Sequence, residues 1–209
     1  MYDVHTSSLW HALTGEPVIG PLAHSGLKLT ILPVTTTTWA EWRDAHPGTR
    51  VLSVDTGFRR PYLHHGDPQS AYFEYFADPG LMFPAFNLDG RLRAKDQVLA
   101  IRFDGMAKAY LLDALAGVGV LNDTFADREL VVVADRLSRA ARAYDRGGHV
   151  FRQGEQARTL IDESGTGWRI EESALVSGGP TPERLVRIPS HTAYWFGWYA
   201  FFPNTEVYR

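Results

Sequence analysis

Two stretches of the chain repeat the same order of residues at a constant distance, and this duplication most constrains the fold. The first contains Leu32-Pro33, Trp39, Trp42, Pro47 and Val51, and the second contains Ile188-Pro189, Trp195, Trp198, Pro203 and Val207. The spacing is the same for every pair, because each residue of the second stretch lies 156 positions after its counterpart. We therefore predict two copies of one structural unit, about Met1 to Ser53 and about Leu160 to Arg209.

The local pattern predicts a strand, a short helix and a returning strand in each copy. In the first copy, apolar and polar residues alternate over Leu27–Ile31, threonines precede a helix over Trp39–Ala45, and Val51-Leu52 follows Pro47-Gly48. In the second copy, the strand is predicted at Leu185–Ile188, and Ser190 or Thr192 is predicted to cap the helix that contains Trp195 and Trp198. Residues three positions apart lie on one helical face, so each copy presents two indoles side by side.

The segment between the copies is predicted to be a β-meander. Its strands are expected at five short runs, of which Leu130–Ala134 has the strongest β pattern, and Asp104-Gly105 is expected to form a hairpin turn. The other four runs are Val98–Phe103, Ala107–Tyr110, Ala141–Tyr144 and His149–Arg152. We predict an α+β, β-rich mixed fold with a central meander and two pseudo-repeated strand–Trp-helix–strand units. Residues 1–96 would hold the first unit and an irregular connection, and residues 97–209 the rest, packed as one compact domain.

The second predicted helix is apolar on every side, because Tyr194, Phe196, Tyr199, Phe201 and Phe202 surround its two tryptophans. Such a helix is buried on every side or lies at an interface. We favour a core role for the four repeated indoles, and the alternative is an aromatic cage or a sugar-stacking surface. An exposed aromatic helix would form a homodimer or protein-partner surface.

Two pairs of residues between the copies are candidate binding residues. Arg59 and Arg60 follow Phe58 in a loop, and their guanidinium groups suit a carboxylate or phosphate, although a solvated loop is the simpler interpretation. Asn122 and Asp123 are predicted to be turn formers whose side chains bond to the loop backbone, and a role in a binding site is the lesser alternative.

His64, His65 and Asp67 are candidate metal ligands, because histidine and carboxylate are ligand types and neighbouring histidines on extended backbone can both coordinate. A surface turn is the competing interpretation. No histidine pair has the helical spacing of four residues that is typical of metal sites on helices. We therefore predict no cofactor, with a divalent metal as the alternative.

Composition excludes several classes of protein. The net charge of −3 argues against a nucleic-acid binder with a broad basic face. The chain has no cysteine, which excludes disulfides, thiolate nucleophiles and cysteine-ligated metals. No apolar run approaches the roughly 20 residues of a membrane-spanning helix, so we expect no membrane span. We expect a cytoplasmic protein for the chain as given, and an exported one if the natural N-terminus lies before Met1.

Several short motifs, in a specific order, resemble the prokaryotic domain of unknown function 3179 family. The motifs are Tyr2-Asp3, Ser8–Trp10, Leu13–Glu16, Gly20–Leu22, Thr38–Trp42, His46–Leu52, Asp55–Gly57, Ala107–Tyr110, Val120–Asp123 and Tyr144–Arg146. The resemblance implies two further motifs, Trp-His-Glu and Tyr-Cys-Pro-Leu-Cys, which would be the best candidates for metal or redox chemistry. This chain has Gly117–Gly119 and Ala134–Ser138 there. We expect any reactive centre to be lost or to lie before Met1.

We predict an uncharacterised, non-catalytic binding or scaffold domain and assign no catalytic residue. The alternative is a metal-assisted hydrolase in which His64, His65 and Asp67, with a carboxylate such as Asp55, hold a metal that activates water. The chain has no nucleophile elbow and no phosphate-binding loop motif. The adjacent carboxylates Glu171 and Glu172 are expected to be solvated.

Overall fold

The computed structural model describes residues 1–57, 62–63 and 66–209, and the chain divides into two compact units, 1–33 and 34–209. The first unit is a three-stranded antiparallel sheet of β1 (Tyr2–Asp3), β2 (Ser8–Trp10) and β3 (Pro17–Ile19). Among the residues with described positions, no helix is long and apolar enough to cross a membrane. The expected division after residue 96 stays a prediction.

The described residues of the second unit form three further sheets, whose strand orders are β14-β4-β5-β15, β6-β7-β8 and β13-β12-β11-β10-β9. The strands of the first are β4 (Gln97–Phe103), β5 (Met106–Leu111), β14 (Ser190–Tyr194) and β15 (Glu206–Tyr208). Those of the second are β6 (Val120–Phe125), β7 (Arg128–Ala134) and β8 (Ala141–Asp145). The third contains β9 (Arg152–Gln153), β10 (Thr159–Ile161), β11 (Gly167–Ile170), β12 (Ala174–Ser177) and β13 (Arg184–Val186).

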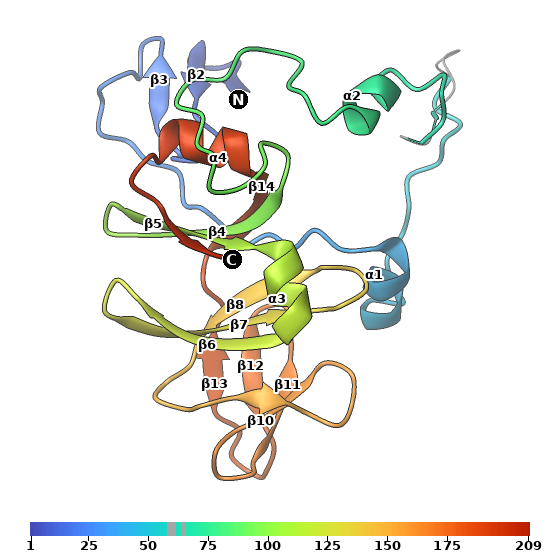
Figure 1. Cartoon of the computed structure of the whole chain (residues 1–209), viewed down its shortest axis with the longest axis vertical. Coiled ribbons are helices and arrows are strands. Elements are labelled where there is room, and N and C mark those ends of the chain that lie inside the picture. The colour runs from blue at the N-terminus through green and yellow to red at the C-terminus, as the bar shows by residue number, and fades with distance from the viewer. Residues whose placement is uncertain (58–61, 64–65) are drawn as a thin grey trace. The chain divides into compact units, whose positions relative to one another are not determined.

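The three sheets of the second unit are stacked in layers around two apolar cores (Figure 1). One core joins Leu99 and Ile101 of β4 to Leu130 and Val132 of β7. Because side chains alternate along a strand, Val131 and Val133 point to the opposite face of β7, where they pack with Trp168 and the five-stranded sheet. The sheet β6-β7-β8 is therefore covered on both faces.

The described residues also form four short helices: α1 (Trp39–Ala45), α2 (Phe73–Ala77), α3 (Leu112–Val118) and α4 (Trp195–Phe201). Helix α4 lies against β14 and β4, on the side of that sheet away from β6-β7-β8 (Figure 1). Trp195 and Trp198 are 1% and 0% exposed, whereas Trp39 of α1 is 50% exposed and α1 has no buried residue.

Helices α1 and α4 have the same local geometry despite this difference in burial. The residue before each helix is extended (φ −77°, ψ 153° and φ −74°, ψ 143°), and the residue after it has φ −135°, ψ 68° or φ −128°, ψ 67°. Trp42 Nε1 donates to Thr49 Oγ1 at 3.0 Å, and Trp198 Nε1 donates to Thr205 Oγ1 at 2.9 Å. The rings of Trp42 and His46 lie 4.0 Å apart, and those of Trp198 and Phe202 lie 4.3 Å apart.

The α+β, β-rich class and the positions of both Trp helices agree with the sequence prediction, and several local predictions were wrong. Neither Ser190 nor Thr192 caps α4, because both lie in β14 and the residue before the helix is Tyr194. Leu27–Ile31 and Val51-Leu52 form no strand, because no neighbouring strand pairs with them. Asn122-Asp123 lie inside β6 rather than in a turn. The strand predicted at His149–Arg152 begins only at Arg152, as β9, and it pairs within the five-stranded sheet and not with β8. The exposed Trp39 also contradicts the core role for all four indoles. That the two Trp units are copies stays a prediction.

Candidate functional site

Four of the predicted site residues, Arg59, Arg60, His64 and His65, lie outside the described residues, so their predicted roles stay predictions. Asp67 lies in a turn, where its Oδ1 accepts a hydrogen bond from Gln69 N at 2.8 Å. Within ranges 1–57, 62–63 and 66–209, no group of three or more metal-ligating side chains could hold a metal ion.

Asn122 bonds to backbone as predicted, although its partner is distant in sequence. Its Nδ2 donates to the carbonyl of Phe151 at 2.7 Å, and its Oδ1 accepts from Phe151 N at 2.8 Å. The Asn122 amide thus makes the two hydrogen bonds that a backbone residue of a neighbouring strand would make. These bonds connect β6 to Phe151, which directly precedes β9 of the five-stranded sheet. This pairing uses both ends of the amide and indicates a structural role.

Asp123 lies in a compact polar cluster with residues of β5 and β15. Its Oδ2 accepts from Tyr110 hydroxyl at 2.8 Å and lies 2.7 Å from Lys108 Nζ, and Lys108 also faces Glu206 at 3.4 Å. Burial, and next the hydrogen bond to Asp123, raise the pKa of Tyr110. Lys108 Nζ thus lies against two carboxylates, and its side chain is only 12% exposed.

The described part of the second unit contains an arginine cluster, which we define as Arg142, Arg158, Arg187, Glu41 and Glu172. Arg142 Nη2 donates to Glu172 Oε1 at 2.8 Å, and Arg187 Nη1 donates to Glu172 Oε2 at 2.7 Å. Arg158 Nη2 reaches the same Oε1 at 3.3 Å. Three guanidinium groups thus converge on one carboxylate, and the side chains of Arg142 and Arg187 are 5% and 4% exposed.

Glu172 is ionised because of this arrangement. Its burial opposes ionisation, but the hydrogen bond from Arg142 and the charges of Arg142 and Arg187 outweigh burial and hold the Glu172 pKa at about 2. The expectation that Glu172 is simply solvated was therefore wrong. A carboxylate held this firmly by guanidinium groups is a poor general acid or base at neutral pH.

The arginine cluster also holds the segment around α1 on the core. Arg142 Nη2 donates to Glu41 Oε1 at 3.3 Å, and Ser138 Oγ donates to Glu41 Oε2 at 2.5 Å. Thr35 Oγ1 hydrogen-bonds to Glu172 Oε2 at 3.3 Å and also accepts from Arg187 Nη2. Charge and hydroxyl contacts, rather than apolar packing, attach residues 35–41 to β8 and to the turn between β11 and β12.

The sequence prediction missed the arginine cluster. The available signal was Arg142 within the alternating run Ala141–Tyr144, next to the strongest predicted strand. An arginine buried in a sheet requires an anionic partner, but the sequence does not say which of 24 acidic residues supplies it.

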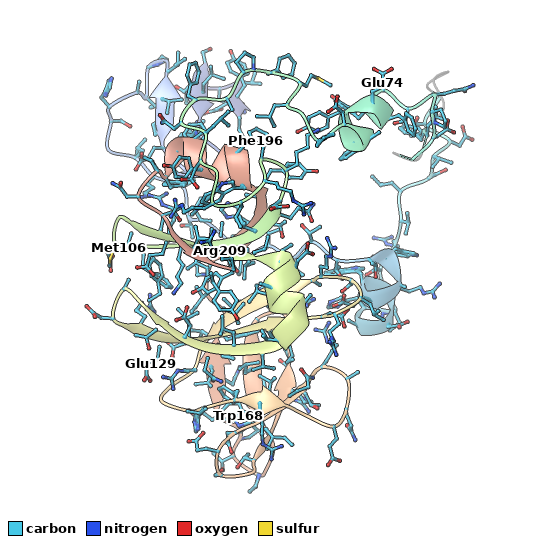
Figure 2. All side chains as sticks on the ribbon, viewed as in Figure 1. Glu74, Met106, Glu129, Trp168, Phe196 and Arg209 are labelled. Atoms are coloured by element: carbon cyan, nitrogen blue, oxygen red, sulfur yellow. The ribbon has the colours of Figure 1, made fainter. Side chains whose placement is uncertain are left out.

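An apolar pocket adjoins α4, with a volume of about 210 Å³. It is lined by Tyr72, Tyr75, Leu81, Met82, Phe83, Pro84 and Phe196. Phe196 lies on α4 (Figure 2), and the other lining residues come from α2 and the chain around it. Lys95 secures α2, because its Nζ lies 3.7 Å from the centre of the Tyr75 ring and donates to the carbonyls of Tyr75 and Asp78 at 2.5 and 2.6 Å.

A second hollow, of about 470 Å³, lies at the other end of α4 and includes Phe201 and Phe202 in its lining. Phe201 is 55% exposed, and Met82 and Phe83 in the first pocket are 50% and 74% exposed. The two buried tryptophans therefore fix α4 to the sheet, while Phe196 borders an apolar pocket and Phe201 and Phe202 border a hollow that also has polar lining residues.

The sequence model of a family described as "Protein of unknown function (DUF3179)" matches residues 1–205. No curated protein matches the chain, and no solved structure matches it.

Proposed function

The chain belongs to the DUF3179 family of proteins of unknown function, and we propose that it is a non-catalytic module that binds a protein partner through α4. The observation that carries this proposal is the apolar pocket lined by Phe196, Tyr72, Tyr75 and Phe83. We thus assign the partner surface expected on the aromatic C-terminal helix to the pocket at Phe196.

The size of the pocket favours a side chain over a whole small molecule. Binding sites for drug-sized ligands usually have volumes of about 300–1,000 Å³, and this pocket has about 210 Å³. One apolar side chain of a partner fits such a space. Exposed apolar residues adjoin it in sequence, since Phe83, Phe86 and Leu88 are 74%, 80% and 63% exposed. Aromatic residues are enriched at protein–protein interfaces, where they supply most of the binding energy.

The state of the described ionisable clusters supports a role without catalysis. Lys108, Asp123 and Glu172 are each engaged by partners of opposite charge within 2.8 Å. Catalytic groups need a pKa near the working pH, whereas that of Glu172 is displaced to about 2, away from neutrality.

The pocket can be tested with N-acetyl-phenylalaninamide as a probe of side-chain binding, followed by amide NMR. We expect shifts confined to residues 72–84 and 194–198, and we expect Phe196→Ser to abolish them. Phe201→Ser, at the other end of the helix, is the matched control and should leave binding unchanged. Shifts elsewhere, or none, would contradict the proposal. A dimer that becomes monomeric in Phe201→Ser would instead identify a second copy of the chain as the partner.

The metal-assisted alternative is tested by elemental analysis of the purified protein. A stoichiometric metal that is lost in His64→Ala/His65→Ala would support a metal site at His64, His65 and Asp67 and would contradict the non-catalytic proposal. The expected result is a metal-free protein, whose two-histidine variant has the same stability as the parent.

We also propose that the units around α1 and α4 are two copies of one scaffold element. The support is the similar dihedral angles at both helix ends, the matching Trp–Thr hydrogen bonds and the matching tilted ring pairs. Because these features recur at residues 156 positions apart, one local sequence pattern accounts for both.

A further inference from the structure

The unit around α4 holds a β-hairpin between its two strands. In the sheet order β14-β4-β5-β15, the hairpin β4–β5 is central, and β14 and β15 lie at its two edges. β14 pairs antiparallel with β4, from Ser190 opposite Ile101 to Tyr194 opposite Gln97. β15 pairs parallel with β5, from Glu206 opposite Lys108 to Tyr208 opposite Tyr110. We call this arrangement of strand, helix and strand a clasp.

The unit around α1 has the parts of the same clasp. Residues 34–38 correspond to β14 and residues 50–52 to β15, at the same distance of 156 positions, with α1 between them. The local geometry of α1 matches that of α4, as described above. The comparison of the α1 clasp with the α4 clasp rests on the proposed duplication of the Trp-helix unit, and not on the proposed binding pocket at α4.

The α1 clasp holds no hairpin within the described residues. Neither 34–38 nor 50–52 is a strand, and Val51 and Leu52 are 70% and 93% exposed. In the part of the chain that the structure describes, no backbone hydrogen bond to another backbone group involves Thr36 or Val51. Trp39, which corresponds to the buried Trp195, is 50% exposed.

The α1 clasp is nevertheless fixed in place on one side. Thr35 contacts Glu172 and Arg187, Glu41 accepts from Arg142, and Thr37 Oγ1 donates to Glu41 Oε2 at 2.6 Å. Val34, Thr36 and Thr38 alternate with these partly buried threonines and are exposed. Val34 N already donates to the carbonyl of Ser190 at 2.9 Å, so the groups open to a new strand are those further along, as at Thr36. An extended segment that is anchored on one face, and whose backbone groups there pair with no described backbone group, is the starting point for addition of a strand. The anchor also lowers the entropic cost of ordering the segment when a partner binds.

We propose that residues 34–52 form a second clasp that binds a β-hairpin of a partner protein. The occupant is defined by what the α4 clasp holds: a hairpin with one strand antiparallel to 34–38 and the other parallel to 50–52, with apolar residues on both faces. In β4, four consecutive residues from Val98 to Ile101 are at most 1% exposed, which shows the chemistry required. The chain's own β4–β5 is not available, because β14 and β15 occupy both of its edges.

The probe for this site is a synthetic peptide of residues 97–111, the chain's own hairpin, added to the full chain. We expect a blue shift of tryptophan emission as Trp39 leaves water, and slower hydrogen exchange at 34–38 and 50–52. Thr36→Pro removes a strand donor and should weaken binding at least tenfold, and Leu52→Asp should weaken it too. Phe196→Ser is the matched control. It should leave hairpin binding unchanged, which separates this proposal from the α4 pocket.

In a second experiment, the same peptide is fused to the chain through a long Gly/Ser linker. The linker raises the effective concentration of the peptide, so that even a weak interaction can be detected. If 34–38 and 50–52 gain no protection in the fusion, the proposal is wrong. Protection at 190–194 instead would mean that the peptide only exchanges with β4–β5, and this also contradicts it. A dimer of the unmodified chain with protection at 34–38 would identify a second copy as the occupant and overturn the choice of a partner protein.

Discussion

The clearest comparison in this molecule is between the two Trp-helix units, which share a local geometry and differ in what holds them. Helix α4 is held by apolar packing, since Trp195 and Trp198 are buried against a sheet. The segment of α1 is held by ions and hydroxyls, through Glu41 and Thr35. The shared pattern of two tryptophans, a threonine and a proline therefore accounts for the formation of the short helix and for the residue at which it ends. It does not determine whether the helix is buried.

This difference shows that burial belongs to the surroundings and not to the motif. The indole of Trp42 donates to Thr49 Oγ1 and that of Trp198 to Thr205 Oγ1, yet Thr49 is exposed and Thr205 is 2% exposed. What α4 has and α1 lacks among the described residues is a hairpin between the flanking strands. The same residues can therefore be a core element in one place and an open surface in another.

The largest expected effect comes from removing one indole from each unit. Trp198→Ala should lower the free energy of unfolding by about 3–5 kcal/mol, because it leaves a cavity under α4. Trp42→Ala should cost about 1 kcal/mol or less, because Trp42 is only half-buried. Urea titrations of both variants and the parent measure the difference. Equal losses would mean that α1 is covered in solution.

The next largest effect comes from the arginine cluster, through Glu172→Gln. The Glu172 pKa is about 2 in the folded chain and 4.5 in its ordinary state. A lowered folded pKa stabilises the protein fully above pH 4.5, and this stabilisation is lost as the pH falls from 4.5 towards 2. The shift corresponds to roughly 3 kcal/mol of unfolding free energy at neutral pH.

The measurement is the free energy of unfolding of parent and Glu172→Gln between pH 7 and pH 2. The variant should be less stable at pH 7 and should lose the acid-dependent component, so that the two curves converge near pH 2. Hydrogen exchange should become faster at 35–41 and stay unchanged at α4. Glu171→Gln is the matched control, because among the described residues the carboxylate of Glu171 forms ion pairs with the exposed arginines Arg169 and Arg184 and not with the buried ones. Loss of protection at α4 would show that the α1 and α4 segments are not held independently of each other.

Local structure was the part of the fold that the sequence could predict. The apolar run Val98–Phe103, the Asp104-Gly105 turn and both Trp helices depend on neighbouring residues only, and the structure contains all of them. Leu27–Ile31 has an equally good strand pattern and forms no strand. A strand needs a partner for its backbone groups, and periodicity does not say whether one is present.

The candidate site was less predictable, because it depends on contacts between distant segments. Arg142 and Glu172 are 30 positions apart, and Glu41 lies 101 positions from Arg142. The pocket at Phe196 similarly requires α2 and α4, which no pattern in the sequence places together. The aromatic composition of α4 indicated a partner surface, but only the packing of Trp195 and Trp198 shows which of its residues remain available.

The smallest effect, and the finest test of the comparison, is removal of the threonine hydroxyl that each indole contacts. Thr205→Val keeps the shape of the side chain but leaves the buried Trp198 N–H without its acceptor, so it should cost about 1–3 kcal/mol. Thr49→Val should cost less than about 0.5 kcal/mol, because water can replace the hydroxyl at an exposed residue. If a hairpin fills the α1 clasp, binding should exclude that water, and the cost of Thr49→Val should rise towards that of Thr205→Val. Denaturation of both variants, with and without the fused hairpin, therefore measures whether the open unit becomes equivalent to the closed one.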